Sequence, residues 1–193
     1  MEYVKLGNSD LNVSRICLGC MGFGDASIGQ HSWTIGEEPT REIIRRSLDL
    51  GVNFFDTAIA YQLGTSEQFV GRALKDMARR EDVVVATKFL PRTEEEITNG
   101  IDGRQHVLSN IDSSLQHLGM DYVDLYIYHI WAYKTPAEEI LEGMNEAVRP
   151  RQGPLHRHRQ RLCLSVGEDE CTGRETRLGK IYQCAEPLQP DHA

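Results

Sequence analysis

Apolar residues in the first 150 positions follow two alternating patterns. Short apolar runs are typical of buried strands, and after each run apolar residues recur every three or four positions, as on one face of a helix. The runs predict strands at residues 15–19, 52–55, 82–87 and 123–128. The periodic stretches predict helices over residues 39–50 and 66–77, around Val107, Ile111, Leu115 and Leu118, and after Pro136. This alternation predicts an α/β protein with a parallel sheet and crossover helices.

Four such βα units suit either half of a (β/α)8 barrel or a doubly wound sheet, and a hairpin is expected before them, over residues 2–14. Gly19, Gly22 and Gly24 follow a GxxGxG spacing. A dinucleotide-binding fingerprint requires GxGxxG and would need a glycine at Ser27. The glycines therefore give little support to a doubly wound dinucleotide-binding domain.

The composition changes at Pro150. Leu, Ile, Val and Phe make up 40 of residues 1–150 but only 7 of the 43 residues from 151 to 193. The second segment has no sustained strand or helix period and too few apolar residues to build a core. We therefore predict that residues 1–149 form the folded part and that residues 150–193 form a loop or are disordered.

Charge and apolar content exclude several classes of protein. The 29 acidic residues outnumber the 21 basic ones, for a net charge of -8, which argues against a general nucleic-acid-binding protein because phosphate affinity requires clustered Lys and Arg. The apolar runs fall far short of the roughly 20 residues that span a bilayer, and no signal-peptide pattern opens the chain. The five cysteines are an odd number with a single CxxC pair, Cys17 and Cys20, and therefore indicate neither a disulfide framework nor a zinc ribbon, which needs two such pairs. We expect a cytoplasmic protein that binds neither nucleic acid nor membrane.

Titratable residues stand at the carboxyl ends of three predicted strands. Asp56 follows the second strand, Lys88 the third and His129 the fourth. Tyr61 lies in the loop just after Asp56. Each residue alone is more often part of a surface ion pair or an ordinary polar strand end. In a barrel, however, these strand ends meet on one face, so the four side chains would surround a small substrate.

Such a set of side chains is suited to reducing a carbonyl group. A tyrosine hydroxyl is a weak acid at neutral pH, but a neighbouring ammonium stabilises the phenolate. Lys88 would supply that ammonium, and Asp56 would keep it charged and in place. His129 would align the carbonyl with a hydrogen bond, and Tyr61 would protonate the alkoxide that forms as hydride reaches the carbonyl carbon.

Nearly all of residues 3–149 resembles the aldo-keto reductase family. The motifs that carry the resemblance are residues 4–7 (VKLG), 13–15 (VSR), 18–24 (LGCMGFG), 53–58 (NFFDTA) with Tyr61, 64–67 (GTSE), 71–74 (GRAL), 86–88 (ATK) and 118–126 (LGMDYVDLY) with His129. As a set these motifs are highly specific. Ile130 and Ala132 depart from the pattern, because these reductases commonly carry Arg and Asp there.

The resemblance implies a (β/α)8 TIM barrel, NADPH as cofactor, and an oxidoreductase that reduces aldehydes or ketones to alcohols. It implies Tyr61 as the general acid, Lys88 and Asp56 as the residues that tune it, and His129 as the residue that orients the carbonyl substrate. It also places Gly19, Cys20 and Met21, together with Asp56, near the cofactor. No metal is expected.

The resemblance stops at Pro150, after about four βα units, and the following residues retain a trace of it in another reading frame. Codons compatible with residues 149–158, read one base later, permit APGKARYIGI, and those for residues 181–193 permit FISVQNHYNLIM. Both strings resemble the family. We therefore hypothesise a frameshift near codon 149 or 150 that truncates the barrel and leaves an unselected, disordered tail.

A barrel truncated in this way would lack the strand that stacks on the nicotinamide and the loops that hold the cofactor phosphates. We therefore expect weak NADPH binding, impaired or absent activity, and self-association through open sheet edges. The rival interpretation is a non-catalytic half-barrel that acts at most as an oligomerising or interaction module.

Two further interpretations concern the tail. A zinc site would draw on Cys163, Cys171, Cys184, His156 and His158, but no two of these cysteines or histidines have the spacing typical of zinc ligands. A nucleic-acid-binding arm would draw on Arg157, Arg159 and Arg161, but acidic residues follow at 168–170. Both interpretations are weaker than that of an unselected tail.

Sequencing the gene from about codon 140 through the stop codon tests the frameshift hypothesis. We expect that a one-base change near codon 149 or 150 restores a continuous reading frame that resembles the family. A gene in which no one-base change restores such a frame would contradict the hypothesis.

Overall fold

The computed structural model of the chain describes residues 1–7, 9–132, 134–148 and 161–163. Its main sheet has five parallel strands: β3 (Cys17–Gly19), β4 (Phe54–Asp56), β5 (Val84–Phe89), β6 (Leu125–Tyr128) and β7 (Arg161–Cys163). The helices are α1 (Glu37–Asp49), α2 (Thr65–Met77), α3 (Glu94–Thr98), α4 (Gly103–Leu118) and α5 (Ala137–Val148). An antiparallel hairpin of β1 (Tyr3–Lys5) and β2 (Asn12–Ser14) precedes the sheet, and the short helical turns η1 (Tyr61–Gly64) and η2 (Arg80–Asp82) flank α2.

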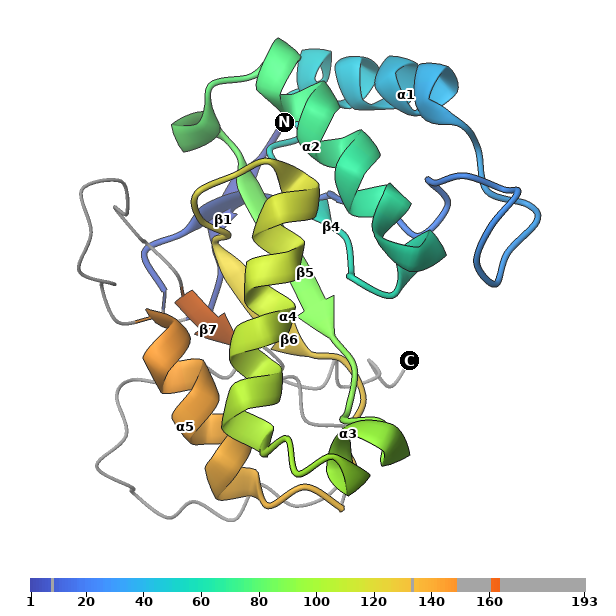
Figure 1. Cartoon of the computed structure of the whole chain (residues 1–193). Coiled ribbons are helices and arrows are strands. Elements are labelled where there is room, and N and C mark those ends of the chain that lie inside the picture. The colour runs from blue at the N-terminus through green and yellow to red at the C-terminus, as the bar shows by residue number, and fades with distance from the viewer. Residues whose placement is uncertain (8, 133, 149–160, 164–193) are drawn as a thin grey trace, which may run out of the picture.

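The arrangement of strands and helices is that of a barrel wall. The strand order β3-β4-β5-β6-β7 follows the order of the chain. Of the helices, α1 contacts α2, α2 contacts α4, and α4 contacts α5, so that α4 lies between α2 and α5 (Figure 1). A doubly wound sheet would reverse its strand order at a switch point and carry helices on both faces. Consecutive parallel strands with neighbouring crossover helices instead match the predicted (β/α)8 type.

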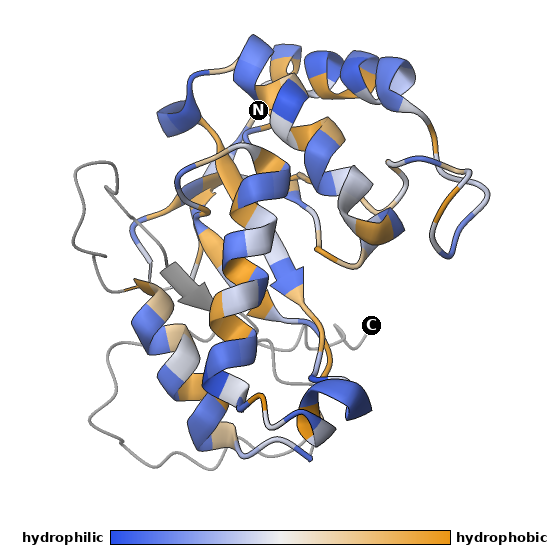
Figure 2. Cartoon of the chain, in the orientation of Figure 1, coloured by the Kyte–Doolittle hydropathy of each residue, from blue (hydrophilic) through white to orange (hydrophobic). Residues whose placement is uncertain are grey.

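The larger core lies between the sheet and these helices. Strand residues Phe55, Val85, Phe89 and Tyr126 are fully buried there. Phe89 stacks on Tyr126 and on Tyr128, with ring centroids 4.7 and 5.0 Å apart. The helices carry both hydrophilic and apolar residues (Figure 2), and burial of each large apolar side chain contributes about 1.5–3 kcal/mol to the stability of the fold.

Among the described helices, none is both long and apolar enough to cross a membrane.

Gly71 allows α2 and α4 to approach each other closely. A Cβ atom added to Gly71 would lie 2.0 Å from the carbonyl oxygen of Leu118, the last residue of α4. Any side chain at this position would push the two helices apart. The close contact therefore depends on a glycine in the middle of α2.

The opposite face of the sheet carries a smaller apolar cluster. Ala86 and Leu125 are buried there, with Phe54 and Ile127 packed against them. Leu6, which follows β1, also packs on this cluster. The hairpin therefore lies against the side of the sheet that faces away from the main core.

The structure differs from the sequence prediction in two elements. The sequence predicts no helix where α3 lies, because five residues are too few to show a helical period. Strand β7 lies in the segment predicted to be loop or disorder, so that prediction is wrong for residues 161–163. Backbone pairing with the edge of β6 requires no apolar pattern, because a strand edge offers its N–H and C=O groups to any extended segment. The other residues predicted as a tail, including most candidate zinc ligands, lie outside the described residues.

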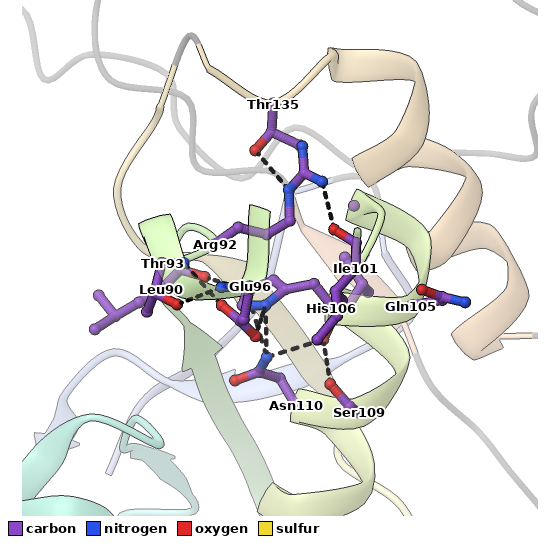
Figure 3. A network of polar contacts seen from close by, with 12 residues as sticks. Leu90, Arg92, Thr93, Glu96, Ile101, Gln105, His106, Ser109, Asn110 and Thr135 are labelled. Atoms are coloured by element: carbon purple, nitrogen blue, oxygen red, sulfur yellow. Dashed lines mark hydrogen bonds and ion pairs between the residues drawn. The ribbon is translucent and has the colours of Figure 1, made fainter. Parts of the chain in front are cut away.

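A polar network fixes the segment that follows β5 (Figure 3). The two ring nitrogens of buried His106 lie 2.9 Å from Glu96 Oε1 and 2.7 Å from the carbonyl oxygen of Leu90. Arg92 donates a hydrogen bond of 2.6 Å to the carbonyl oxygen of Ile101. Burial alone would raise the pKa of Glu96, but hydrogen bonds from Thr93 and His106 outweigh it and lower that pKa. The network holds α3 against the first turns of α4.

A buried ion pair joins α2, β5 and α4. Glu67 is fully buried, and its carboxylate accepts a 2.6 Å hydrogen bond from Thr87 and lies 2.8 Å from His117 Nδ1. The hydrogen bond to Glu67 raises the pKa of His117, although partial burial opposes this effect. The folded state therefore binds the His117 proton more tightly than the unfolded state does.

This pair predicts a pH dependence of stability. Its contribution is complete below the ordinary histidine pKa of about 6.5 and is lost as pH rises through the higher folded pKa. We expect the free energy of unfolding, measured in urea, to fall over this range in the wild type. Glutamine at position 117 cannot titrate, so His117→Gln should lack this part of the fall in the free energy of unfolding. The same pH dependence in wild type and His117→Gln would contradict a stabilising His117–Glu67 ion pair.

Candidate active site

The four predicted catalytic residues converge at the carboxyl edge of the sheet. Asp56 is the last residue of β4, and Lys88 is the last but one of β5. His129 follows β6 directly, and Tyr61 opens η1. Asp56 and Lys88 thus lie within strands, although the apolar runs predict strands that end one residue before each of them. Both residues are paired with a neighbouring strand, Asp56 with Ala86 of β5 and Lys88 with Ile127 of β6.

The ammonium group of Lys88 lies at the centre of the cluster. Lys88 Nζ is 2.8 Å from Asp56 Oδ1 and donates to the carbonyl oxygen of Thr57 at 2.8 Å. It also donates to the Tyr61 hydroxyl at 3.2 Å. The Lys88 side chain is 11% exposed, whereas that of Asp56 is 31% exposed. The cluster is therefore closed on the lysine side and open to solvent on the carboxylate side.

Tyr61 presents both its hydroxyl and its ring to the ammonium. Besides the contact with the hydroxyl, Lys88 Nζ lies 4.8 Å from the centroid of the Tyr61 ring. A cation in this position is attracted to the ring as well as to the oxygen. The arrangement keeps a positive charge beside both the ring and the oxygen of the phenol.

His129 completes the cluster on the side of β6. Its ring meets that of Tyr61 edge to face, with centroids 5.8 Å apart, and its backbone N–H donates to the carbonyl oxygen of Phe89 at 2.9 Å. Burial, and secondly the charge of Lys88, lower the pKa of His129, while Asp56 opposes them. The imidazole is therefore neutral at pH 7. Its Nδ1 atom is buried and has no hydrogen-bond partner among the described residues.

The residues predicted to contact the cofactor lie beside this cluster. Gly19 pairs with Asp56 across the sheet, and a Cβ atom added to Gly19 would meet nothing within 4 Å. Met21 is 40% exposed. Space next to Gly19, a partly exposed Asp56 and a neutral imidazole fit the nicotinamide end of a dinucleotide at this edge.

Cys20 differs from its two neighbours because all its polar groups are engaged within the protein. Its side chain is fully buried, and its thiol lies 3.3 Å from the carbonyl oxygen of Leu18. Its N–H donates to the backbone carbonyl oxygen of Asp56 and its carbonyl oxygen accepts from the Ser66 hydroxyl, both at 2.8 Å. Burial raises the pKa of the Cys20 thiol, so it remains protonated. The cofactor contacts expected of Gly19, Cys20, Met21 and Asp56 stay predictions.

Two residues beside the predicted site residues carry no signal in the sequence. Thr57 holds the Lys88 ammonium through a backbone carbonyl, and no side-chain type signals such a role. Gln62, directly after Tyr61, is buried and bonded to a distant loop. A polar residue in a turn is ordinarily exposed, so nothing in the local sequence marks it.

Within the described residues, no three His, Cys, Asp or Glu side chains are grouped so that they could bind a metal ion.

Comparison with known proteins identifies relatives of this chain. The model of the aldo/keto reductase family matches residues 15–153. Versiconal hemiacetal acetate reductase of Aspergillus parasiticus is 34% identical over 166 residues, which cover 77% of this chain and 48% of that protein. Aldo-keto reductase yakc [NADP(+)] of Schizosaccharomyces pombe is 34% identical over 148 residues, which cover 75% of this chain and 41% of that protein. The chain thus spans less than half the length of these two relatives.

A solved structure shows the same fold. The thermostable aldo-keto reductase Tm1743 superposes with a TM-score of 0.66 and 30% sequence identity, over 84% of this chain and 54% of that chain. All the predicted site residues lie within the range that the family model matches. The predicted fold class, an α/β barrel of the aldo-keto reductase type that extends over about four βα units, is confirmed.

The pKa of His129 reports whether the Lys88 ammonium lies beside it. Lys88→Met removes a charge that lowers this pKa, so we expect His129 to titrate at a higher pH in the variant than in the wild type. An NMR titration of the ring protons measures the shift. Lys75→Met removes an exposed lysine from α2 and should leave the titration unchanged. Identical His129 curves in wild type and Lys88→Met would contradict the geometry.

Proposed function

Because the chain belongs to the aldo/keto reductase family, we propose that it carries the reaction centre of an NADPH-dependent reductase that converts aldehydes or ketones to alcohols. The supporting observation is the 3.2 Å contact between Lys88 Nζ and the Tyr61 hydroxyl. An ammonium beside a phenol favours release of the phenol proton, which a general acid requires. Asp56 and His129 lie at the same strand edge and complete the centre.

In the proposed mechanism, Tyr61 donates its hydroxyl proton to the carbonyl oxygen of the substrate. Bound NADPH supplies the hydride that adds to the carbonyl carbon. The phenolate left on Tyr61 lies beside the Lys88 ammonium, which offsets its negative charge until solvent returns a proton. Asp56, 2.8 Å from the same ammonium, keeps it in position.

His129 acts as a neutral hydrogen-bond donor that orients the carbonyl group. Its lowered pKa prevents a second positive charge next to Lys88. A neutral imidazole can hold the carbonyl oxygen without surrendering its own proton, so Tyr61 remains the acid. The edge-to-face contact of the two rings brings the donor and the acid to the same side of the site.

The cofactor in this proposal is NADPH, consistent with the NADP(+) in the name of the Schizosaccharomyces pombe relative. Gly19 and Met21 would lie along its nicotinamide, next to Asp56. The substrate in this proposal is a small carbonyl compound. The Aspergillus parasiticus relative is named as a reductase of a hemiacetal acetate, and a hemiacetal releases a carbonyl group when it opens.

A second candidate function is self-association without catalysis. In the described part of the chain, β3 has a strand partner only on its β4 side, and Ile16, next to it, is 60% exposed. An unpaired strand edge is a template for pairing with another chain. In this alternative the half-barrel is an interaction module, and two copies meet through their sheet edges.

Tyr61→Phe removes one oxygen atom and tests the catalytic proposal. We expect NADPH oxidation in the presence of an aromatic aldehyde to fall by about 100-fold or more, because the general acid is lost. The urea midpoint should stay close to that of the wild type. Tyr3→Phe is the matched control and should retain turnover. It removes from the distant hairpin a hydroxyl that donates a hydrogen bond to the carbonyl oxygen of Gly51.

Two outcomes of this experiment would contradict catalysis by the cluster. Equal turnover in Tyr61→Phe and wild type would exclude Tyr61 as the acid. A folded, monodisperse oligomer of the wild type that leaves NADPH unoxidised would favour the interaction module.

A further inference from the structure

The side chain of Gln62 fills the interior of a distant loop. Its amide oxygen accepts hydrogen bonds from the backbone N–H groups of Gln30 at 3.1 Å and His31 at 2.9 Å. Its amide nitrogen lies within hydrogen-bond distance of three backbone carbonyls, those of Asp25 at 2.9 Å, Ile28 at 2.6 Å and His31 at 3.0 Å. With 2% exposure, Gln62 acts as a buried anchor for residues 24–34.

The loop is shaped to enclose this amide. Its two ends are joined by hydrogen bonds from the Gly24 N–H to Ile35 and from the Ile35 N–H to Gly22. Gly24 and Gly29 both have positive φ angles, and a Cβ atom on either would lie within 2.9 Å of a Gln62 atom. The loop thus has the closed neck of an Ω-loop, but a side chain from η1 fills its centre.

The backbone of η1 adopts a conformation that such anchoring explains. Gln62 and Leu63 have φ angles of 46° and 51°, in the left-handed region that residues other than glycine rarely adopt. Such residues persist where surrounding contacts determine the conformation. Leu63 is 67% exposed, so of these two residues only Gln62 has a buried side chain that can hold the turn. The Thr65 hydroxyl adds a bond to the carbonyl oxygen of Gln62 at 2.9 Å and accepts from the Asp25 N–H at 3.0 Å.

We propose that Gln62 is a positioning residue of the reaction centre. Its amide fastens the 24–34 loop to the turn that begins with Tyr61, and so holds the Tyr61 hydroxyl against Lys88. The proposal rests on the function proposed above, in which Tyr61 donates the proton. A turn released from the loop would let the phenol move away from the ammonium, and a displacement of about 1 Å is enough to cost a large factor in rate.

A pair of glycine variants separates the amide anchor from the turn conformation. Gln62→Gly removes the amide and relieves the left-handed backbone. Leu63→Gly relieves the same backbone conformation at the next residue and leaves the amide in place. If the turn alone matters, the two variants behave alike, whereas an anchoring amide makes only Gln62→Gly defective.

Three readouts on the full chain compare these variants with the wild type. In Gln62→Gly we expect the amide protons of Gln30 and His31 to exchange at least about tenfold faster. We expect the NMR cross-peak between the Tyr61 and His129 rings to be lost, and kcat to fall about tenfold or more. The dissociation constant for NADPH should stay unchanged. Both variants should be folded in the assay, with a lower urea midpoint for Gln62→Gly because the backbone groups of the loop lose their partners. Leu63→Gly should resemble the wild type in all three readouts.

The results that would overturn the proposal are distinct from those that would overturn the function. If Gln62→Gly exposes the loop to exchange but keeps the ring cross-peak and kcat, Gln62 only anchors the loop and does not position Tyr61. If all three readouts are unchanged, the anchor itself is wrong. A wild type without turnover contradicts the proposed reaction alone, and the exchange rates and the cross-peak then decide whether Gln62 positions Tyr61.

Discussion

The ammonium group of Lys88 has lost most of its hydration, because its side chain is only 11% exposed. A charge in this position is tolerated only where hydrogen-bond acceptors replace the lost water. The Asp56 carboxylate and the Thr57 carbonyl replace it at 2.8 Å, and the Tyr61 hydroxyl adds a third oxygen at 3.2 Å. The buried Lys88 ammonium thus needs oxygen partners, and these partners include the Asp56 and Tyr61 groups of the proposed reaction.

Parallel pairing of β4 and β5 brings these groups within reach of one another. Asp56 pairs with Ala86, and side chains two positions apart on a strand share a face of the sheet, so Lys88 lies on the same face as Asp56 and one step further along. On the opposite face of the sheet, the main core packs against the helices. Gly71 lets α2 and α4 approach each other closely over this core. The site therefore depends on strand register at the edge and on helix packing behind the sheet.

Sequence patterns predict the alternating strands and helices because their apolar residues repeat with a clear period. They also predict Asp56, Lys88 and His129 as site residues, because each stands at the end of an apolar run. Tyr61 is predicted from its place in the loop after Asp56. The short helix α3 and the strand β7 escape prediction because end capping and edge pairing leave no apolar period. Gln62 escapes for another reason, since its partners are backbone groups some 30 positions away that no local pattern reveals.

The most direct test of the reaction centre follows deuterium from the cofactor into the product. Wild type and Lys88→Met are incubated with an aromatic aldehyde and NADPH that carries deuterium at both C4 positions of the nicotinamide, and the alcohol is analysed by mass spectrometry. We expect the wild type to produce alcohol with one deuterium on the carbinol carbon, although slowly because it binds NADPH weakly, and Lys88→Met to produce about 100-fold less. Equal amounts from the two proteins, or none from a folded wild type, would contradict the proposed reaction centre.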